Sequence, residues 1–198
     1  MYIITCVLIC LAILSFTLVL DPVYKYNENR FILGLMFLLC PILWSLPTLT
    51  FDSKFQINAF ALFSAFALIL AMIWGRGMLL KLTGLIVFGG MAFFISMLAL
   101  TFLSLRIPQW VIALMLGMLC MYISDGTTEA FIFGLNAVWM FELAVGVWDM
   151  IGNRGISFDF ASMTPYSALS GIFTFSLKCL AGFLEAKLFR YKKKLSKA

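Results

Sequence analysis

Long apolar stretches alternate with short polar segments along the whole chain. The apolar stretches cover residues 2–20, 31–50, 57–74, 82–105, 110–123, 131–151 and 166–186. An α-helix needs about 20 consecutive apolar residues to cross the hydrocarbon core of a bilayer, which is about 30 Å thick. The pattern therefore predicts an all-α fold, a polytopic transmembrane bundle of about seven helices. Residues 1–198 then form a single integral membrane domain.

The fifth stretch, 110–123, is only marginally long enough to span. Apolar runs of about 10–14 residues are often re-entrant or interfacial, so a six-helix alternative stays open. Pro41 and Pro47 fall inside the second stretch and favour a bent helix, because each removes a backbone N–H donor. Between the stretches, 51–56 is expected to be a short polar turn and 152–165 a small structured surface loop.

The basic residues of the loops are distributed unevenly. With seven spans, one side carries Lys25, Arg30, Arg76, Lys81, Lys187, Arg190, Lys192, Lys193, Lys194 and Lys197. The other side carries Lys54, Arg106 and Arg154. Because cytoplasmic loops are enriched in Lys and Arg, this predicts an outside N-terminus and a cytoplasmic C-terminus with a short basic tail at 187–198. A six-helix arrangement would move the basic residues of the first and third loops outside and weaken the bias.

Composition excludes a soluble protein. Hydrophobic residues make up 64% of the chain and charged residues 12%, with a mean hydropathy of +1.07. Soluble domains usually contain about 45–50% apolar and about 25% charged residues. The net charge of +5 comes largely from the C-terminal tail and gives no basic surface for nucleic acid. The expected surroundings are the lipid bilayer, with other integral membrane proteins or a second copy of this chain as candidate partners.

The sequence contains none of the common catalytic motifs. Without histidine there is no Ser-His-Asp triad and no HExxH zinc site, and no Gly-rich phosphate loop is present. The five cysteines are scattered through apolar stretches without a CxxC pair and are expected to pack as small hydrophobic residues. The polar run at 123–129 is expected to form a turn. The sequence therefore predicts neither an enzyme nor a cofactor or metal site.

The last two apolar stretches are unusual because they carry polar and ionisable residues. These are Asn136, Glu142, Asp149, Lys178 and Glu185. A charge near the bilayer centre costs about 2.5–3.5 kcal/mol, so each is a candidate functional or paired position. Glu142 and Lys178 lie near the middle of neighbouring antiparallel stretches, which makes an interhelical ion pair the leading hypothesis.

Other interpretations of the same residues stay open. Glu142 could be protonated and hydrogen-bonded to Asn136, to serine or to the backbone, and Lys178 could extend towards the cytoplasmic face. A proton or ion path through these positions is a further alternative.

Several segments resemble the YphA type of small membrane protein from Gram-positive endospore-formers. They are LPTLTF leading to INAFALFSAF, the run ALTFLSLRIPQWV, and GISFDFASM followed by FLEAKLFRYKK. The resemblance covers most of the chain through apolar texture and loop placement. It implies a bacterial plasma membrane and transfers no functional residue.

Two functions remain in view. The first is a non-enzymatic structural or accessory subunit whose helices pack with partner membrane proteins. The second is a small transporter or channel, or the substrate-binding membrane subunit of one, with a polar path around Glu142 and Lys178. A contiguous polar cavity would distinguish the second from the first.

Overall fold

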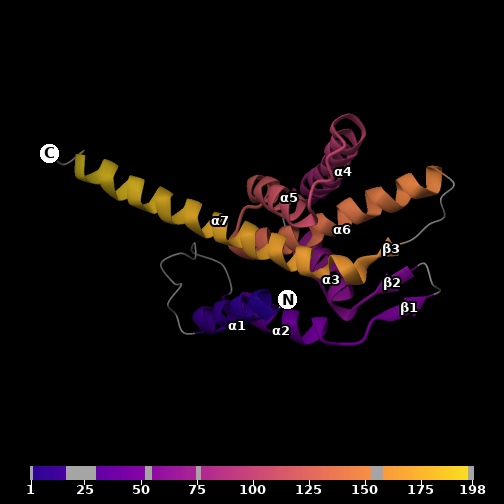
Figure 1. Ribbon diagram of the computed structural model, residues 1–198. Helices are drawn as coiled ribbons and strands as arrows, with labels where there is room; N and C mark the ends of the chain where they lie inside the picture. Colours follow the sequence, from indigo (N-terminus) through magenta and orange to yellow (C-terminus); the bar gives the residue numbers. More distant parts are fainter. Residues whose placement is uncertain (1, 17–29, 52–54, 75–76, 153–157, 196–198) are drawn as a thin grey trace.

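The computed structural model describes residues 2–16, 30–51, 55–74, 77–152 and 158–195 (Figure 1). Within these ranges the chain forms helices and short strands. In chain order they are α1 (Tyr2–Phe16), α2 (Arg30–Trp44), β1 (Leu49–Phe51), β2 (Phe55–Ile57), α3 (Ala59–Trp74), α4 (Met78–Leu103), α5 (Gln109–Ile123), α6 (Thr127–Ile151), β3 (Phe158–Asp159) and α7 (Phe160–Leu195). The all-helical class predicted from the apolar stretches is confirmed.

Two helices begin at side chains that cap them. The Asn58 side-chain oxygen accepts the backbone N–H of Ala61 in the first turn of α3, at 2.9 Å. The Asp159 carboxylate accepts the backbone N–H of Ser162 in the first turn of α7, at 3.0 Å. Such side chains satisfy N–H groups that have no partner within the helix. The Asn58 amide also donates to the Thr164 hydroxyl, so the cap of α3 is tied to α7.

Helix α6 occupies the centre, and α7 runs beside it and extends past the other helices towards the C-terminus (Figure 1). They are in close contact at Gly134, where a side chain would meet the backbone of Ser170 and Gly171. Small residues at a crossing let two helix backbones come close. This contact fixes how far α6 and α7 are shifted along each other.

Consecutive helices of the described chain run in opposite directions. Phe16 at the end of α1 packs on Phe31 at the start of α2, with ring centroids 5.6 Å apart. Trp44 at the end of α2 faces Phe60 at the start of α3. The alternation continues to α7, so the C-terminal parts of α1, α3, α5 and α7 lie near the N-terminal ends of α2, α4 and α6. Lys81 therefore lies at the same end as the C-terminal half of α7.

A small sheet closes the opposite end. Strands β1 and β2 pair antiparallel, with Leu49 opposite Ile57, and β3 adds to β2 in parallel, with Phe158 opposite Phe55. The predicted polar turn at 51–56 is thus partly wrong, because residues 51, 55 and 56 belong to paired strands, while 52–54 lie outside the described residues. The pairing satisfies backbone groups where the chain leaves the helices. Strand β3 pairs with β2 from about a hundred residues away in the chain, beyond the reach of local sequence patterns, whereas β1 and β2 are neighbours in the chain.

Three of the described helices are long and apolar enough to cross a membrane, as judged by length and composition. They cover Leu79–Leu103, Thr127–Ile151 and Phe160–Glu185. The other four contain 15 or 16 residues, about 23 Å at 1.5 Å per residue. Helix α2 in particular ends at Trp44, so Pro41 lies inside it and Pro47 beyond it.

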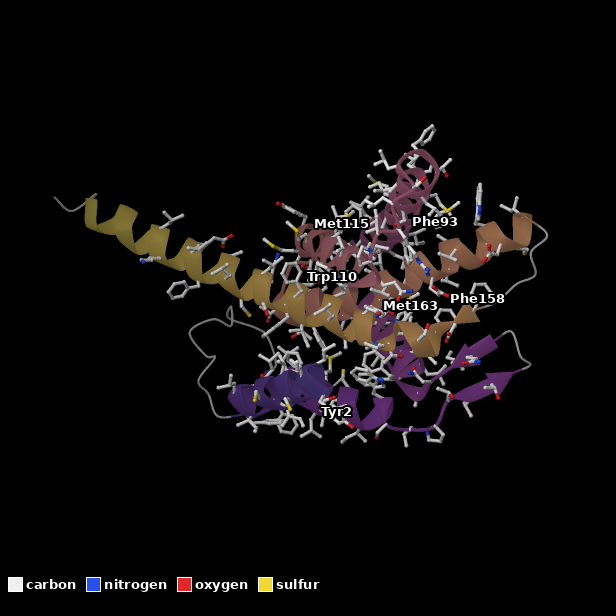
Figure 2. All side chains as sticks on the ribbon, in the orientation of Figure 1. Tyr2, Phe93, Trp110, Met115, Phe158 and Met163 are labelled. Atoms are coloured by element: carbon white, nitrogen blue, oxygen red, sulfur yellow. The ribbon has the colours of Figure 1, made fainter. Side chains whose placement is uncertain are left out.

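Outward-facing side chains on the helices are mostly hydrocarbon (Figure 2). Phe94 on α4 and Phe183 on α7 are among many large apolar residues that are more than half exposed. Extended apolar surfaces of this kind mark contact with lipid or with another protein. The long apolar helices and this surface support association with a membrane.

Candidate functional site

Glu142 lies on the buried side of α6, close to the sheet. The residue is 6% exposed, and its Oε1 accepts the backbone N–H of Asp159 at 3.4 Å. Asp149, half-buried two turns further along α6, and Asp159 both interact electrostatically with Glu142. The surroundings of Glu142 are therefore the start of α7 and two other carboxylates.

Lys178 lies at the other end of the bundle. Its Nζ donates to the backbone carbonyl of Met121 at 3.3 Å and to that of Ser124. Carbonyls in the last turn of a helix lack partners within that helix, and a cation there also complements the helix dipole. Lys178 thus caps the C-terminus of α5, and Glu185 follows two turns later at an exposed position on α7.

The register of α6 and α7 explains why Glu142 and Lys178 are apart. The Ser167 hydroxyl donates to the Leu135 carbonyl and marks where the two helices are level. From this contact Glu142 is 142 − 135 = 7 residues along α6, and Lys178 is 178 − 167 = 11 residues along α7 in the opposite direction. About 18 residues at 1.5 Å each separate them by about 27 Å. The predicted ion pair is not formed in the structure, because the prediction assumed that the centres of the two stretches are level.

We expect the free energies of unfolding lost on Glu142→Gln and Lys178→Met to add within about 0.5 kcal/mol, because groups this far apart share no partner. The double variant and both single variants would be unfolded by SDS titration in mild detergent. Lys178→Met alone should be destabilising, since it removes the lysine donor from the Ser124 carbonyl and, among the described residues, leaves the Met121 carbonyl with the Ser124 hydroxyl alone. A coupling energy above about 1 kcal/mol would restore the ion-pair hypothesis.

The Asn136 side chain is hydrogen-bonded to backbone carbonyls of two helices. Its Nδ2 donates to the Ser64 carbonyl of α3 at 3.0 Å and to the Ile132 carbonyl of its own helix at 2.8 Å. Trp139 Nε1 donates to the Ser64 hydroxyl at 2.7 Å. These bonds join α3 to α6 in the buried interior, where hydrogen bonds are stronger than in water. Asn136 is therefore not brought together with Glu142 or Lys178 in one site.

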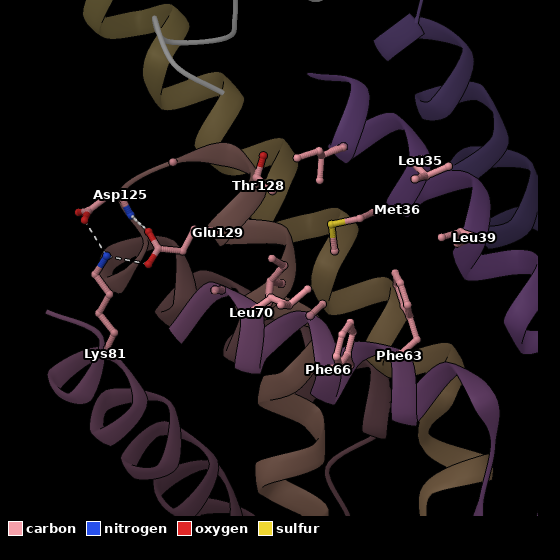
Figure 3. A pocket seen from close by; sticks show the side chains of 15 residues that line it. Leu35, Met36, Leu39, Phe63, Phe66, Leu70, Lys81, Asp125, Thr128 and Glu129 are labelled. Atoms are coloured by element: carbon pink, nitrogen blue, oxygen red, sulfur yellow. Dashed lines mark hydrogen bonds and ion pairs between the residues drawn. The ribbon is translucent and has the colours of Figure 1, made fainter. Parts of the chain in front are cut away.

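A pocket of about 570 Å³ opens between α2, α3 and the start of α6 (Figure 3). Its walls are apolar side chains of α2 and α3, together with Ile132 of α6. They are Ile32, Leu35, Met36 and Leu39 from α2, and Phe63, Phe66, Ala67, Leu70 and Ala71 from α3. Ile32, Leu35 and Phe66 are 41–58% exposed, so the pocket opens sideways onto the apolar outer surface.

One end of the pocket is charged. Lys81 Nζ of α4 lies 2.6 Å from Asp125 Oδ2 and 2.6 Å from Glu129 Oε1 (Figure 3). The other carboxylate oxygen of Glu129 accepts the backbone N–H of Asp125 at 2.7 Å. The side chains of Lys81 and Glu129 are 13% and 17% exposed, whereas that of Asp125 is 83% exposed. This charged cluster of Lys81, Asp125 and Glu129 carries two negative charges and one positive charge.

Comparison of the chain with protein families, with characterised proteins and with solved structures gave no match. The assignment of a site therefore depends on the geometry of this chain.

The charged cluster was missed in the sequence, although a signal for it was present. The predicted turn at 123–129 holds two acids and no base, and Lys81 lies in the preceding loop of the same predicted side. Opposite charges in loops that share one side of a membrane are candidates to meet. In the structure this pairing borders a cavity large enough for a ligand.

Proposed function

We propose that this protein is a non-enzymatic accessory protein of the bacterial plasma membrane, related to the YphA type, that holds an amphipathic ligand. Its seven helices cross the bilayer with the N-terminus outside and the C-terminus in the cytoplasm. The observation that carries the proposal is the pocket between α2 and α3, which has apolar walls and charges at one end only. An amphipathic molecule has the same division into an apolar body and a polar head.

The position of the pocket supports this function. The charged cluster is formed by the first turns of α4 and α6 and by the turn before α6, at one end of the helices. In a membrane, helix ends lie near the headgroup region and their middles lie in hydrocarbon. A ligand could then move sideways out of one leaflet without passing through water.

We expect Leu70→Trp to lower the amount of lipid that co-purifies with the protein at least fivefold, because the larger ring would project into the pocket that Leu70 lines and obstruct an acyl chain there. Ile69→Trp is the matched control, since Ile69 is the neighbouring residue of α3, is 53% exposed and does not line the pocket. Native mass spectrometry of both variants in mild detergent gives bound lipid per protein. Equal retention by Leu70→Trp and Ile69→Trp would contradict the proposed function.

Packing with a partner membrane protein is the second candidate, and Gly90 of α4 favours it. A side chain at Gly90 would meet no atom within 4 Å, and Ile86 and Phe94 on the same face are more than half exposed. A glycine on an apolar face lets another helix approach closely. Affinity purification in mild detergent separates the candidates, because a stoichiometric protein partner favours packing and retained lipid alone favours the pocket.

The transporter alternative loses the observation that favoured it. It relied on a polar path joining Glu142 to Lys178, which lie about 27 Å apart by helix register. Glu142 accepts a hydrogen bond from the Asp159 N–H before α7, whereas Lys178 donates to the Met121 carbonyl at the end of α5.

A further inference from the structure

The charged cluster has unused hydrogen-bonding capacity of both kinds. Lys81 has three ammonium hydrogens, and within the described residues two of them serve Asp125 and Glu129. The third can be donated to an anionic oxygen. Each carboxylate oxygen can accept more than one hydrogen bond, so Asp125 and Glu129 can accept further N–H donors. The cluster can therefore hold a headgroup that contains both an anion and an N–H cation.

The net charge of the cluster restricts the headgroup further. Two carboxylates and one ammonium leave a net negative charge, which repels a purely anionic headgroup at short range. A cation with N–H donors gains charge-assisted hydrogen bonds to the carboxylates. A quaternary ammonium carries the same charge without any N–H donor and cannot form those bonds.

The apolar walls have the dimensions of part of one acyl chain. Phe63 and Leu70 lie seven residues apart on α3, about 10 Å along the helix axis. One leaflet contributes about 15 Å to the hydrocarbon core, so the groove accepts about two thirds of a chain. A helix from a partner protein is about 10–12 Å wide with its side chains and would need its own charged end to match the cluster.

From these features we propose that the pocket binds a bilayer phospholipid whose headgroup carries a primary ammonium, as in phosphatidylethanolamine. Its ammonium donates to Asp125 and Glu129, its phosphate accepts from Lys81, and one acyl chain lies between α2 and α3 against Leu35 and Phe66. This inference rests on the proposed function and names the class of ligand for the same pocket.

The test is a competition on the full-length protein in mild detergent, read by native mass spectrometry. The probes are dioleoyl phosphatidylethanolamine, phosphatidylcholine and phosphatidylglycerol in equal amounts, which share acyl chains and differ in headgroup. Phosphatidylethanolamine should be bound about tenfold over phosphatidylcholine, the factor given by a free-energy difference typical of lost charge-assisted hydrogen bonds. Asp125→Asn should reduce that preference to about twofold, and the exposure of Asp125 makes this variant compatible with folding.

The outcomes separate the two proposals. If Leu70→Trp lowers binding of all three lipids but wild-type protein binds them equally, the headgroup proposal is overturned and the proposed function stands. If Leu70→Trp changes nothing, both are overturned. A preference for phosphatidylglycerol, or a co-purified polypeptide that none of the lipids displaces, would also contradict a primary-ammonium phospholipid as the occupant.

Discussion

Gly134→Ala is expected to destabilise the protein by about 2–3 kcal/mol, the cost of forcing an extra group into a packed interior. The added methyl group would lie 2.8 Å from the Gly171 Cα and 2.8 Å from the Ser170 carbonyl oxygen. Both are backbone atoms of α7, so no side-chain rotation can relieve the overlap. The central helix would have to move away from α7 along the contact that sets their register.

Gly90→Ala is the matched control, because the same methyl group meets no atom within 4 Å there. Alanine is a better helix former than glycine by about 1 kcal/mol in soluble helices, so this variant should be neutral or slightly stabilised. SDS titration in mild detergent gives both free energies of unfolding. Similar values for the two variants would show that α6 and α7 are not in close contact at Gly134.

The neighbouring glycine offers a second comparison within α4. A methyl group at Gly89 would lie 2.8 Å from the Met140 carbonyl carbon and 2.9 Å from the Phe141 nitrogen of α6. Gly89→Ala should therefore destabilise the protein as Gly134→Ala does, although alanine is expected to be harmless at the next residue, Gly90. Local helix propensity is the same at both positions, so the difference measures packing alone.

The positions of several helices could be predicted closely from the apolar stretches, whereas α7 begins at Phe160, inside the surface loop predicted at 152–165. The stretch at 110–123 became α5 (Gln109–Ile123), and the stretch at 57–74 became α3 (Ala59–Trp74). A change from apolar to polar residues marks where a helix leaves its apolar surroundings, and local composition records that change directly. Composition does not record how α5 is accommodated in a membrane: its 15 residues extend about 23 Å, so the proposed crossing requires the bilayer to thin around it.

The axial shift of one helix relative to its neighbour could not be predicted in the same way. Centring the two last stretches placed Glu142 level with Lys178, whereas Gly134 and Ser167 set a register that separates them. Register depends on which small residues let backbones approach, and several glycines in these helices were equally good candidates in the sequence. The error of about 18 residues, or about five turns, explains why Glu142 and Lys178 bond to two different parts of the backbone instead of to each other.

The candidate site itself depends on tertiary structure. The walls of the pocket come from α2 and α3, and its charges come from α4, from α6 and from the turn before α6. Apolar residues on α2 and α3 look the same in the sequence whether they face lipid, a neighbouring helix or a cavity. Only the packing shows that a pocket lies between these two helices and that Lys81 borders it.

Lys81→Met is expected to cost about 2–3 kcal/mol of unfolding free energy. Removing one partner of a buried ion pair typically costs about 3–5 kcal/mol, because the remaining charge stays buried without compensation. Here the cost should fall below that range, since Asp125 is 83% exposed and can turn to solvent. Glu129 cannot do so as easily, because its side chain is 17% exposed and its Oε2 is held by the Asp125 N–H.

The two carboxylates should therefore respond differently when they are removed together with the lysine. Adding Glu129→Gln to Lys81→Met should recover most of the lost stability, with a coupling energy above about 1.5 kcal/mol. Adding Asp125→Asn should recover little, with a coupling below about 0.5 kcal/mol, as for exposed ion pairs. Both cycles use the same SDS titration. Equal coupling in the two cycles would mean that burial does not set the strength of these pairs, and that Glu129 is as accessible to water as Asp125. A larger coupling energy with Glu129→Gln than with Asp125→Asn would instead identify the Lys81–Glu129 pair as the fixed part of the cluster. Asp125 could then change partners when a headgroup binds.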